Sequence, residues 1–350
     1  MASERERTTG GRAARSVITG LMWGKMISSL LSSTLRLGVA DVLGDGARTA
    51  TEVAERCGTL PDTTLRLLRA LAGLELLTEE RPGVFRLTPA GALLRTDNPE
   101  GMSTLVRLYT DSVINGGWEQ LDHSLRTGLP AFDEVFGHDY FTHLKENPDV
   151  SADFNRAMGQ STRLTAQVVT SHYDFSRFGT VVDVGGGDGT LVAGILRENP
   201  ELRGVIYDTP EGLAQAPALL EDAGVAGRCA LETGDFFASA PAGGDLYLLK
   251  SILHDWNDSQ CAAILNGIRK VIPEGGRVLA VDPVLADVVD PATVRVQHYL
   301  SDLNMLVNAG GRERTEQDLR KLFADTGFTL TSITPLAEPS VLSLVEATPV

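Results

Sequence analysis

The decisive stretch of this sequence is Val181-Val182-Asp183-Val184-Gly185-Gly186-Gly187-Asp188-Gly189-Thr190. Its β-branched start predicts a strand, its glycines predict a turn, and a helical pattern follows. Glycine lets a backbone turn tightly and approach a ligand closely. The dinucleotide pattern GxGxxG would need a glycine where Thr190 stands, so the stretch reads DxGxGxG instead. Because such turns also follow strands that bind nothing, this stretch alone leaves the presence of a ligand open.

Short apolar strands alternate with helical stretches after this turn. Four further strands are predicted at Gly204–Tyr207, Cys229–Thr233, Leu246–Leu249 and Arg277–Val281. This alternation predicts an α/β fold, with a parallel sheet wound with helices on both faces. Two final apolar runs, Thr329–Ile333 and Val341–Val345, are joined through Pro335 and Pro339 and are expected to pair antiparallel at the sheet edge.

The first third of the chain predicts helices and a winged-helix module. Residues Ala13–Leu43 are helical in pattern, with apolar side chains on more than one face. A partner subunit or the chain's own first domain would explain that pattern equally well. Helices at Thr51–Cys57 and Pro61–Leu76 and a strand at Val84–Leu87 then follow in the order of a winged helix.

Charge argues against nucleic acid as the partner of this module. The second helix of the module carries only Arg66 and Arg69 as basic residues, and Glu75, Glu79 and Glu80 follow it. The whole chain has a formal net charge of −15, which repels phosphate backbones and anionic membranes. We therefore interpret the module as a scaffold.

Length and composition predict a two-domain protein that lies outside the membrane. At 350 residues, 43% of them hydrophobic, the chain can bury two cores, and no apolar run approaches the roughly 20 residues that span a bilayer. Met1–Arg15 predicts a frayed tail rather than a signal peptide, and hence a cytoplasmic location. The cysteines, Cys57, Cys229 and Cys261, show no CxxC pairing, so neither a disulfide nor a metal site is expected.

Acidic residues follow the second and third predicted strands. Asp208 comes about 20 residues past the glycine-rich turn, where a carboxylate can accept both ribose hydroxyls, and it is expected to contact only ribose. Asp235 is positioned to take an adenine amino group, while Phe236 either covers the ring or is a core aromatic. Carboxylates without a basic phosphate clamp suit a cofactor that has no phosphates and a positive sulfonium, namely S-adenosylmethionine.

A histidine follows the fourth strand, where open α/β folds bind ligands. His254 has a side chain suited to removing a proton from a hydroxyl near neutral pH, although it could instead cap the next helix. Asp282 ends the fifth strand, and Glu313 precedes a helix with a capping box. Either acid could orient the imidazole and stabilise its charged form, or could simply be solvated or capping.

Four ordered motifs give the chain its resemblance to a known family. They are Val182–Gly189, Gly234-Asp235-Phe236-Phe237, Leu249–Asp258 and Gly310-Gly311-Arg312-Glu313-Arg314-Thr315. From Ala13 to Val345 the chain resembles the plant-type, or caffeate-like, small-molecule O-methyltransferases, in their bacterial branch that tailors natural products such as antibiotics. The resemblance implies a Rossmann-like class I methyltransferase domain with an antiparallel edge strand and an N-terminal winged-helix dimerisation domain.

The resemblance also implies site residues and domain boundaries. His254 matches the family's general base, and Asp282 and Glu313 match its flanking acids. Cofactor-binding positions are expected at Asp183, Gly185, Gly187, Asp208, Asp235, Phe236, Lys250 and Trp256, and acceptor contacts at Met158 and Asn308. The predicted domains are 1–100 for dimerisation, 101–165 as a helical linker with acceptor-pocket residues, and 166–350 for S-adenosylmethionine.

The predicted activity is methylation of a hydroxyl on a small aromatic or polyketide-type natural product, by a homodimer joined through its N-terminal helices. One alternative is a relative on the same scaffold with altered chemistry, such as N-methylation or S-adenosylmethionine-dependent hydroxylation or decarboxylation. A second is a winged-helix regulator that binds a small ligand. The acceptor itself cannot be identified from the sequence, because its pocket is assembled from scattered residues.

Overall fold

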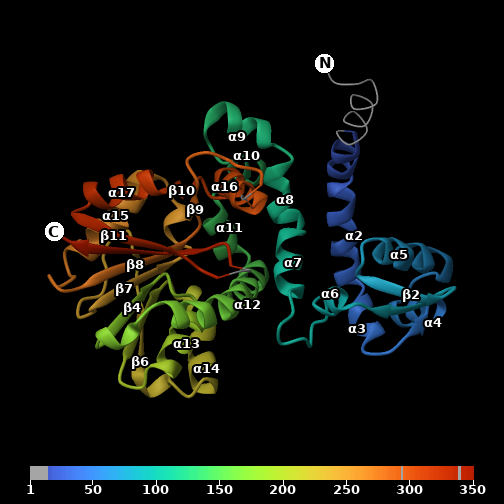
Figure 1. Cartoon of the computed structure of the whole chain (residues 1–350), viewed down its shortest axis with the longest axis horizontal. Helices are drawn as coiled ribbons and strands as arrows, with labels where there is room; N and C mark the ends of the chain where they lie inside the picture. The colour runs from blue at the N-terminus through green and yellow to red at the C-terminus, as the bar shows by residue number, and fades with distance from the viewer. Residues whose placement is uncertain (1–14, 293–294, 338–339) are drawn as a thin grey trace. The chain divides into compact units, whose positions relative to one another are not determined.

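The structure is a computed structural model that describes residues 15–292, 295–337 and 340–350. The chain divides into two units, with the boundary between Asn115 and Gly116 (Figure 1). The predicted tail up to residue 14, the predicted helix start at Ala13 and the connection through Pro339 lie outside the described residues. The predicted division into three parts at residues 100 and 165 stays a prediction.

The second unit is built on a seven-stranded sheet in the order β11-β12-β8-β7-β4-β5-β6. Its strands are β4 (Thr180–Val184), β5 (Arg203–Asp208), β6 (Cys229–Thr233), β7 (Leu246–Lys250), β8 (Arg277–Asp282), β11 (Phe328–Pro335) and β12 (Ser343–Pro349). Strands β4 to β8 pair in parallel, and β12 pairs antiparallel with both β8 and β11. The five predicted parallel strands and the final antiparallel pair are confirmed. Within that pair, β12 lies inside, next to β8, and β11 forms the edge.

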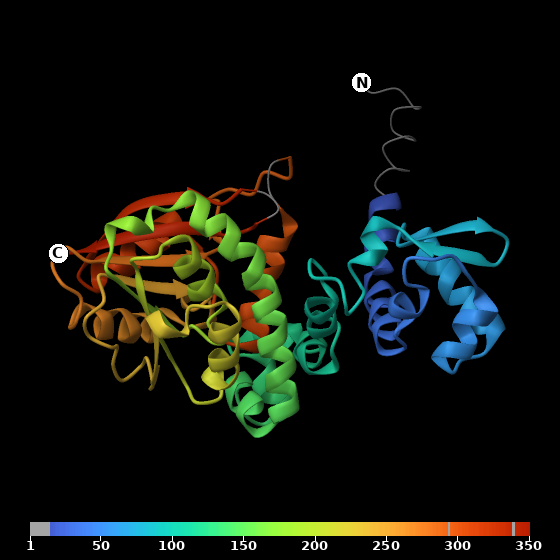
Figure 2. The same ribbon diagram turned by 90° about the horizontal axis from the view of Figure 1, so that it is seen from below.

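Helices cover both faces of this sheet, which explains why its central strands are apolar throughout. On one face lie α12 (Pro148–His172), α13 (Thr190–Glu198) and α14 (Ala216–Asp222); on the other lie α15 (Asp258–Arg269) and α17 (Glu316–Asp325). Figure 2 shows the length of α12, in green, beside the sheet. The residues of β7 from Leu246 to Leu249 are accordingly all buried.

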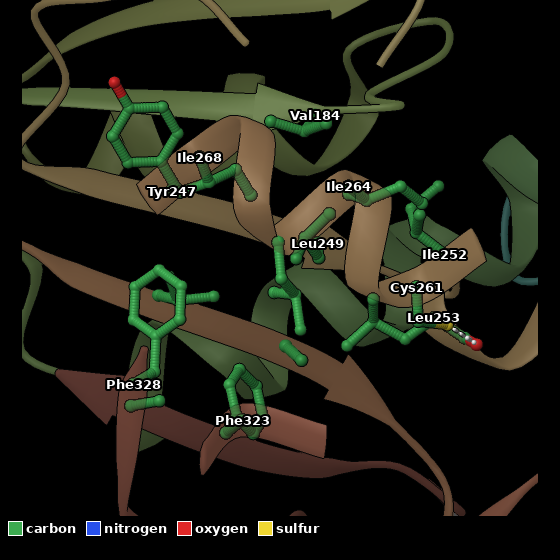
Figure 3. Close-up of a cluster of buried hydrophobic side chains, with 14 of the residues drawn as sticks. Val184, Tyr247, Leu249, Ile252, Leu253, Cys261, Ile264, Ile268, Phe323 and Phe328 are labelled. Atoms are coloured by element: carbon green, nitrogen blue, oxygen red, sulfur yellow. Dashed lines mark hydrogen bonds between the residues drawn. The ribbon is translucent and has the colours of Figure 1, made fainter. Parts of the chain in front are cut away.

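The core on the α15 side extends to the start of the predicted catalytic segment. Tyr247, Phe323 and Phe328 are fully buried there, and the Tyr247 hydroxyl donates to the carbonyl oxygen of Pro241 at 2.6 Å. Figure 3 shows Cys261 at one end of this cluster, with its thiol donating a hydrogen bond to the carbonyl oxygen of Leu253. Since Leu253 opens the 3-10 turn η4 (Leu253–Asp255), the core anchors the turn that carries residue 254.

Further helices of the second unit lie near α16 (Val296–Asn308). They are α9 (Leu121–Thr127), α10 (Ala131–Phe136) and α11 (Tyr140–Glu146), and α8 (Ser112–Trp118) spans the boundary of the two units. Two of them, α9 and α10, pack against α16. A short parallel pair joins β9 (Val284–Leu285) to β10 (Arg314–Thr315). This pair brings the segment before α17 close to the end of β8. The remaining 3-10 turns are η1 (Phe175–Arg177), η2 (Gly212–Gln215) and η3 (Ala226–Arg228).

The first unit contains the predicted winged-helix order. Its elements are a helical segment at 15–22, α2 (Gly24–Arg36), α3 (Val39–Leu43), β1 (Arg48–Thr49), α4 (Ala50–Cys57), α5 (Pro61–Gly73), β2 (Leu77–Arg81), β3 (Val84–Leu87), α6 (Pro89–Ala92) and α7 (Ser103–Tyr109). Antiparallel strands form a sheet in the order β1-β3-β2. Leu43, Val53, Leu68, Leu71 and Phe85 form its core.

Two sequence expectations for the first unit are wrong in detail. The helix predicted to run to Leu43 is interrupted at Gly38, whose φ of +65° ends a right-handed helix. The helix predicted to run to Leu76 ends at Gly73, and β2 follows it. Strand β2 was not predicted because it lies at the sheet edge and most of its side chains are polar and exposed. Within the described residues, no helix is both long and apolar enough to cross a bilayer.

Candidate active site

The glycine-rich turn joins β4 to α13, and its backbone takes conformations that residues with a side chain rarely adopt. Gly185, Gly187 and Gly189 have φ angles of +75°, +57° and +80°, a region that favours glycine. At Gly185 a Cβ would also lie 2.4 Å from Cδ1 of Ile252. Beside Gly187, in contrast, a Cβ would meet no atom within 4 Å, so open space adjoins the turn. The turn therefore offers bare backbone to a ligand.

Asp208, at the end of β5, binds this turn directly. Its Oδ2 accepts a hydrogen bond from the backbone N–H of Gly187 at 2.8 Å, and its Oδ1 accepts one from Thr209 at 2.7 Å. Burial raises the pKa of the Asp208 carboxyl. The expectation that Asp208 contacts only ribose is therefore wrong, because the same carboxylate holds the turn in place.

Asp183 and Lys250 place opposite charges beneath the turn. Asp183 is buried at the end of β4, and burial, with a smaller contribution from Asp208, raises its pKa to about 7. Burial lowers the pKa of Lys250, while Asp282 and Asp183 oppose that shift. The Nζ of Lys250 donates to Oγ1 of Thr162 at 3.2 Å, so α12 contributes to this site.

The long helix α12 lies close to the turn as well. At Gly159 a Cβ would lie 2.4 Å from Oδ2 of Asp188, so a larger residue there would displace this carboxylate. Met158 precedes it, and the carbonyl oxygen of Met158 accepts from Oγ1 of Thr162 at 2.6 Å. Sequence reasoning missed Thr162, which no motif or spacing pattern on α12 distinguishes. Asp188 lies within the glycine-rich motif, but no role was predicted for it. The acceptor contact assigned to Met158 stays a prediction.

Aromatic rings line the neighbouring part of the site. Trp256 stacks on Phe141, with ring centroids 4.9 Å apart, and meets Phe237 edge-on at 4.8 Å. Phe236 lies 6.1 Å from Trp256, and its Cε1 would be 3.5 Å from a Cβ at Gly185. Asp235 is exposed and accepts from the backbone N–H of Phe237 at 2.8 Å. The indole N–H of Trp256 is buried without a hydrogen-bond partner in the described structure.

His254 lies between the buried carboxylate of Glu313 and the half-buried carboxylate of Asp255. Its Nδ1 donates to Oε1 of Glu313 at 3.0 Å, and its Nε2 lies 3.5 Å from Oδ1 of Asp255. The same oxygen of Glu313 accepts from Oγ of Ser301 at 2.7 Å, and the Glu313 backbone N–H donates to Asp302 at 2.9 Å. The structure thus brings His254 and Glu313 together as predicted, and it adds Asp255, Ser301 and Asp302, which sequence reasoning missed.

Asp282 is the third acidic residue, after Glu313 and Asp255, that interacts with His254. Burial raises its pKa to about 6, against an opposing effect of His254. Both of its carboxylate oxygens are buried without a hydrogen-bond partner in the described structure, as is Oε2 of Glu313. Burial likewise raises the pKa of Asp255 to about 6. Burial favours neutral His254, but the charges of Asp255 and Glu313 outweigh it and raise its pKa to about 10.

Asn308, on α16, belongs to a separate group of hydrogen-bonded side chains. Its Nδ2 donates to Oδ1 of Asn304 at 2.9 Å, and the indole N–H of Trp118 donates to the same oxygen at 2.8 Å. A Cβ at Gly117 would lie 2.8 Å from Oδ1 of Asn308. That oxygen is buried without a hydrogen-bond partner in the described part of the chain.

The order of the sheet, its reversed strand and the glycine-rich turn after β4 define a class I methyltransferase fold. The chain belongs to the O-methyltransferase family, because residues 118–329 match the O-methyltransferase domain and residues 19–97 match the O-methyltransferase dimerisation domain. The second match supports a homodimer. Within the described residues, no group of three or more His, Cys, Asp or Glu side chains is arranged to hold a metal ion.

Similar proteins support the same assignment. The chain is 48% identical to an O-demethylpuromycin-O-methyltransferase of Streptomyces alboniger, over 96% of this chain and 90% of that one. The structure of the mitomycin 7-O-methyltransferase MmcR is similar with a TM-score of 0.89 and 33% identity, covering 98% of this chain and 100% of that one. NcsB1, an O-methyltransferase from neocarzinostatin biosynthesis solved with S-adenosylmethionine and 2-hydroxy-5-methyl naphthoic acid, has a TM-score of 0.77 and 33% identity, covering 93% and 96%.

This protein is an S-adenosylmethionine-dependent O-methyltransferase. The predicted family, the fold class and the cofactor are thereby confirmed.

Proposed function

We propose that His254 is the general base that takes the proton from an aromatic hydroxyl of the acceptor. The observation that carries this proposal is the 3.0 Å hydrogen bond between Nδ1 of His254 and the buried carboxylate of Glu313. With Nδ1 occupied, Nε2 is the nitrogen that receives the proton. Glu313 then orients the ring and stabilises the imidazolium, and Asp255 and Asp282 add negative charge around it.

The residues around the turn fit S-adenosylmethionine. Bare backbone at Gly185 and Gly187, open space beside the turn and carboxylates without a cluster of basic groups suit a cationic nucleoside. When bound, this cofactor supplies an electrophilic methyl carbon on a positive sulfur. We assign its binding to the predicted residues Asp183, Gly185, Gly187, Asp208, Asp235, Phe236, Lys250 and Trp256. Of these, Asp208 would take ribose hydroxyls with its remaining lone pairs, and Phe236 would pack against adenine.

The acceptor is proposed to be a small aromatic natural product. NcsB1 was solved with a hydroxynaphthoic acid, and the Streptomyces alboniger relative is named for a demethylated puromycin, which supports an antibiotic or similar compound. Met158 on α12 and Asn308 on α16 are the proposed acceptor contacts. The buried, unpartnered Oδ1 of Asn308 would accept a hydrogen bond from a polar group of that compound.

The first unit is proposed to join two subunits in the cytoplasm and not to bind DNA. Val17 and Leu21, in the helical segment before α2, are 62% and 72% exposed, so apolar surface remains for a second copy of this chain. In the module, Arg69 pairs with Glu79 and Arg86 pairs with Glu80. Positive charge that is already paired supports no strong attraction to phosphate. Tight binding of random duplex DNA in a low-salt gel shift would overturn this part.

A variant pair tests the base. His254→Gln is expected to lower kcat about 100-fold or more, the usual size of a general-base contribution, and to leave the affinity for S-adenosylhomocysteine within about twofold in calorimetry. His172→Gln changes an exposed histidine on α12 and is the matched control. Unchanged turnover in His254→Gln would show that catalysis proceeds by proximity alone.

Matched acceptors test the chemistry. A panel of phenols and the corresponding anilines, incubated with methyl-labelled cofactor and followed by mass spectrometry, is expected to show transfer to oxygen. Transfer only to the anilines would assign N-methylation to this chain. A hydroxylated or decarboxylated product would assign the other altered chemistries.

A further inference from the structure

A buried arginine, Arg314, donates hydrogen bonds to the backbone on both sides of His254. Arg314 donates from Nη1 to the carbonyl oxygen of Leu253 at 2.6 Å and from Nη2 to that of Trp256 at 2.9 Å. These two carbonyls bracket His254 and Asp255 in the chain. The thiol of Cys261 donates to the same two oxygens, at 3.1 Å and 3.5 Å, and Figure 3 shows the first of these bonds.

Arg314 is held too tightly to be an ordinary surface charge. Its side chain is 3% exposed, and Nε and Nη2 donate to Oδ1 of Asp258 at 3.1 Å and 2.7 Å. A buried guanidinium is tolerated only when its charge is paired and its donors are used. The planar fork of an arginine, which a lysine lacks, lets one side chain hold two carbonyls and a carboxylate at once.

The same segment also packs its backbone on the turn. At Gly311 a Cβ would lie 2.0 Å from the carbonyl oxygen of His254 and 2.3 Å from the carbonyl carbon of Asp255. Residues 311–314 therefore touch the turn in three ways: by the backbone of Gly311, by the Glu313 carboxylate on the imidazole, and by the Arg314 guanidinium on the flanking carbonyls.

We propose that Arg314 is a positioning residue that fixes the backbone of His254 so that Nε2 meets the acceptor hydroxyl. The proposal rests on the proposed role of His254 as base, because Arg314 acts only through it. The turn η4 is three residues long and begins two residues after Ser251, which has a φ of +54°. So short a turn depends on outside contacts to hold its shape. A displacement of about 1 Å at a reacting group can cost roughly 100-fold in rate.

A double-mutant cycle tests this role. Arg314→Met and Arg314→Lys are each made with His254 intact and with His254→Gln, and Arg312→Met is the control. Arg312 belongs to the same segment but is 44% exposed and pairs with Asp318. Single-turnover rates, the acceptor KM and calorimetric affinity for S-adenosylhomocysteine are measured on the full-length protein. Because Arg314→Lys keeps the positive charge, it replaces Arg314→Met in the double-mutant cycle if the Met variant does not fold.

The expected result is a loss that depends on His254. With His254 intact, Arg314→Met lowers kcat about 10- to 100-fold, Arg314→Lys lowers it less, and the acceptor KM and cofactor-product affinity stay within about threefold. In the His254→Gln background neither change lowers kcat further, and Arg312→Met has no effect in either background.

Two results would overturn the proposal, and they differ from each other. An equal fold-loss from Arg314→Met in both backgrounds would mean that Arg314 supports the fold in general, while the base keeps its role. Full activity of His254→Gln alone would remove the base itself, and the positioning role with it.

Discussion

Nδ1 of His254 and Oε1 of Glu313 lie 3.0 Å apart, although 59 residues separate them in the chain. Glu313 has a fully buried side chain, and Ser301 donates to the same carboxylate oxygen. A fixed carboxylate in a buried setting acts strongly on its neighbour, because little water screens it. The charge of Glu313 is therefore expected to control when His254 can accept a proton.

Glu313→Gln should move the pH dependence of turnover. The carboxylates of Asp255 and Glu313 raise the pKa of His254, and only the deprotonated imidazole is a base. Removing the charge of Glu313 lowers that pKa, so the rising limb of kcat against pH should shift to lower pH by about one unit or more. Glu316→Gln changes an exposed residue of α17 and should leave the limb in place. An unmoved limb in Glu313→Gln would disprove the coupling.

Asp282→Asn should stabilise the protein near neutral pH. The folded state raises the pKa of Asp282 from 3.8 to about 6, chiefly by burial, so ionisation opposes folding. The wild type keeps its full stability below the unfolded pKa of 3.8 and loses part of it as the pH rises through about 6. We expect the variant to gain roughly 1–3 kcal/mol at pH 7 and nothing at pH 4. Thermal melting at both pH values measures this, with exposed Asp222→Asn as control.

Gly185→Ala and Gly187→Ala should separate two effects of a side chain on the turn. Both glycines have positive φ, but only at Gly185 would a Cβ strike a neighbour, Ile252, at 2.4 Å. We expect the Gly187 variant to lose roughly 1–2 kcal/mol of stability and the Gly185 variant roughly 2–4 kcal/mol. Denaturant unfolding compares them, and equal losses would mean that the contact with Ile252 relaxes freely.

The sequence could predict the parts of this molecule that depend on local pattern. The alternation of short apolar runs with helical stretches predicted the strands β4 to β8. The signal is strongest in β7 and β8, which are almost entirely buried, and weakest in the exposed edge strand β6. The glycine-rich turn and the segment around His254 were also recognisable, since each follows directly from a strand. The edge strand β2 was missed because solvent-facing polar side chains mask its pattern.

The rest of the site depends on contacts that no local pattern contains. Ser301 and Asp302 reach Glu313 from α16, and Thr162 reaches Lys250 from α12. Serine, threonine and aspartate at such positions are ordinary on helices, so only the tertiary structure assigns them. The hydrogen bond by which Asp208 holds Gly187 could not be predicted for the same reason.

Asp208→Ala and Asp208→Asn should differ, because the carboxylate also holds Gly187. Alanine removes the acceptor of the Gly187 N–H, so we expect both a lower melting temperature and weaker binding of S-adenosylhomocysteine. Asparagine keeps one acceptor oxygen for that bond. It loses only the acceptor of the Thr209 N–H, so its melting temperature should fall less than that of the alanine variant. It should still bind about tenfold more weakly, since its amide cannot accept both ribose hydroxyls. Wild-type affinity in Asp208→Asn would remove this residue from the ribose site.

Binding of S-adenosylmethionine should release protons from the protein, and binding of S-adenosylhomocysteine should not. Nearby carboxylates raise the pKa of His254 in the free protein to about 10, so the imidazole is largely protonated at neutral pH. A positive sulfonium brought close to it disfavours a second cation and lowers that pKa, whereas the neutral sulfur of the product does not. The release should increase from about pH 7 to pH 9 as the lowered pKa is approached. Calorimetry in buffers of different ionisation enthalpy counts these protons.

The His254→Gln variant provides the decisive comparison for this release. It lacks the titrating imidazole, so its proton count on binding S-adenosylmethionine should match the count for S-adenosylhomocysteine. Equal release in the variant and the wild type would assign the protons to a group other than His254, such as Asp183, whose pKa is about 7. In the wild type, Asp255 and Asp282 are not this source, because their pKa values are about 6 and they have few protons left to lose above pH 7.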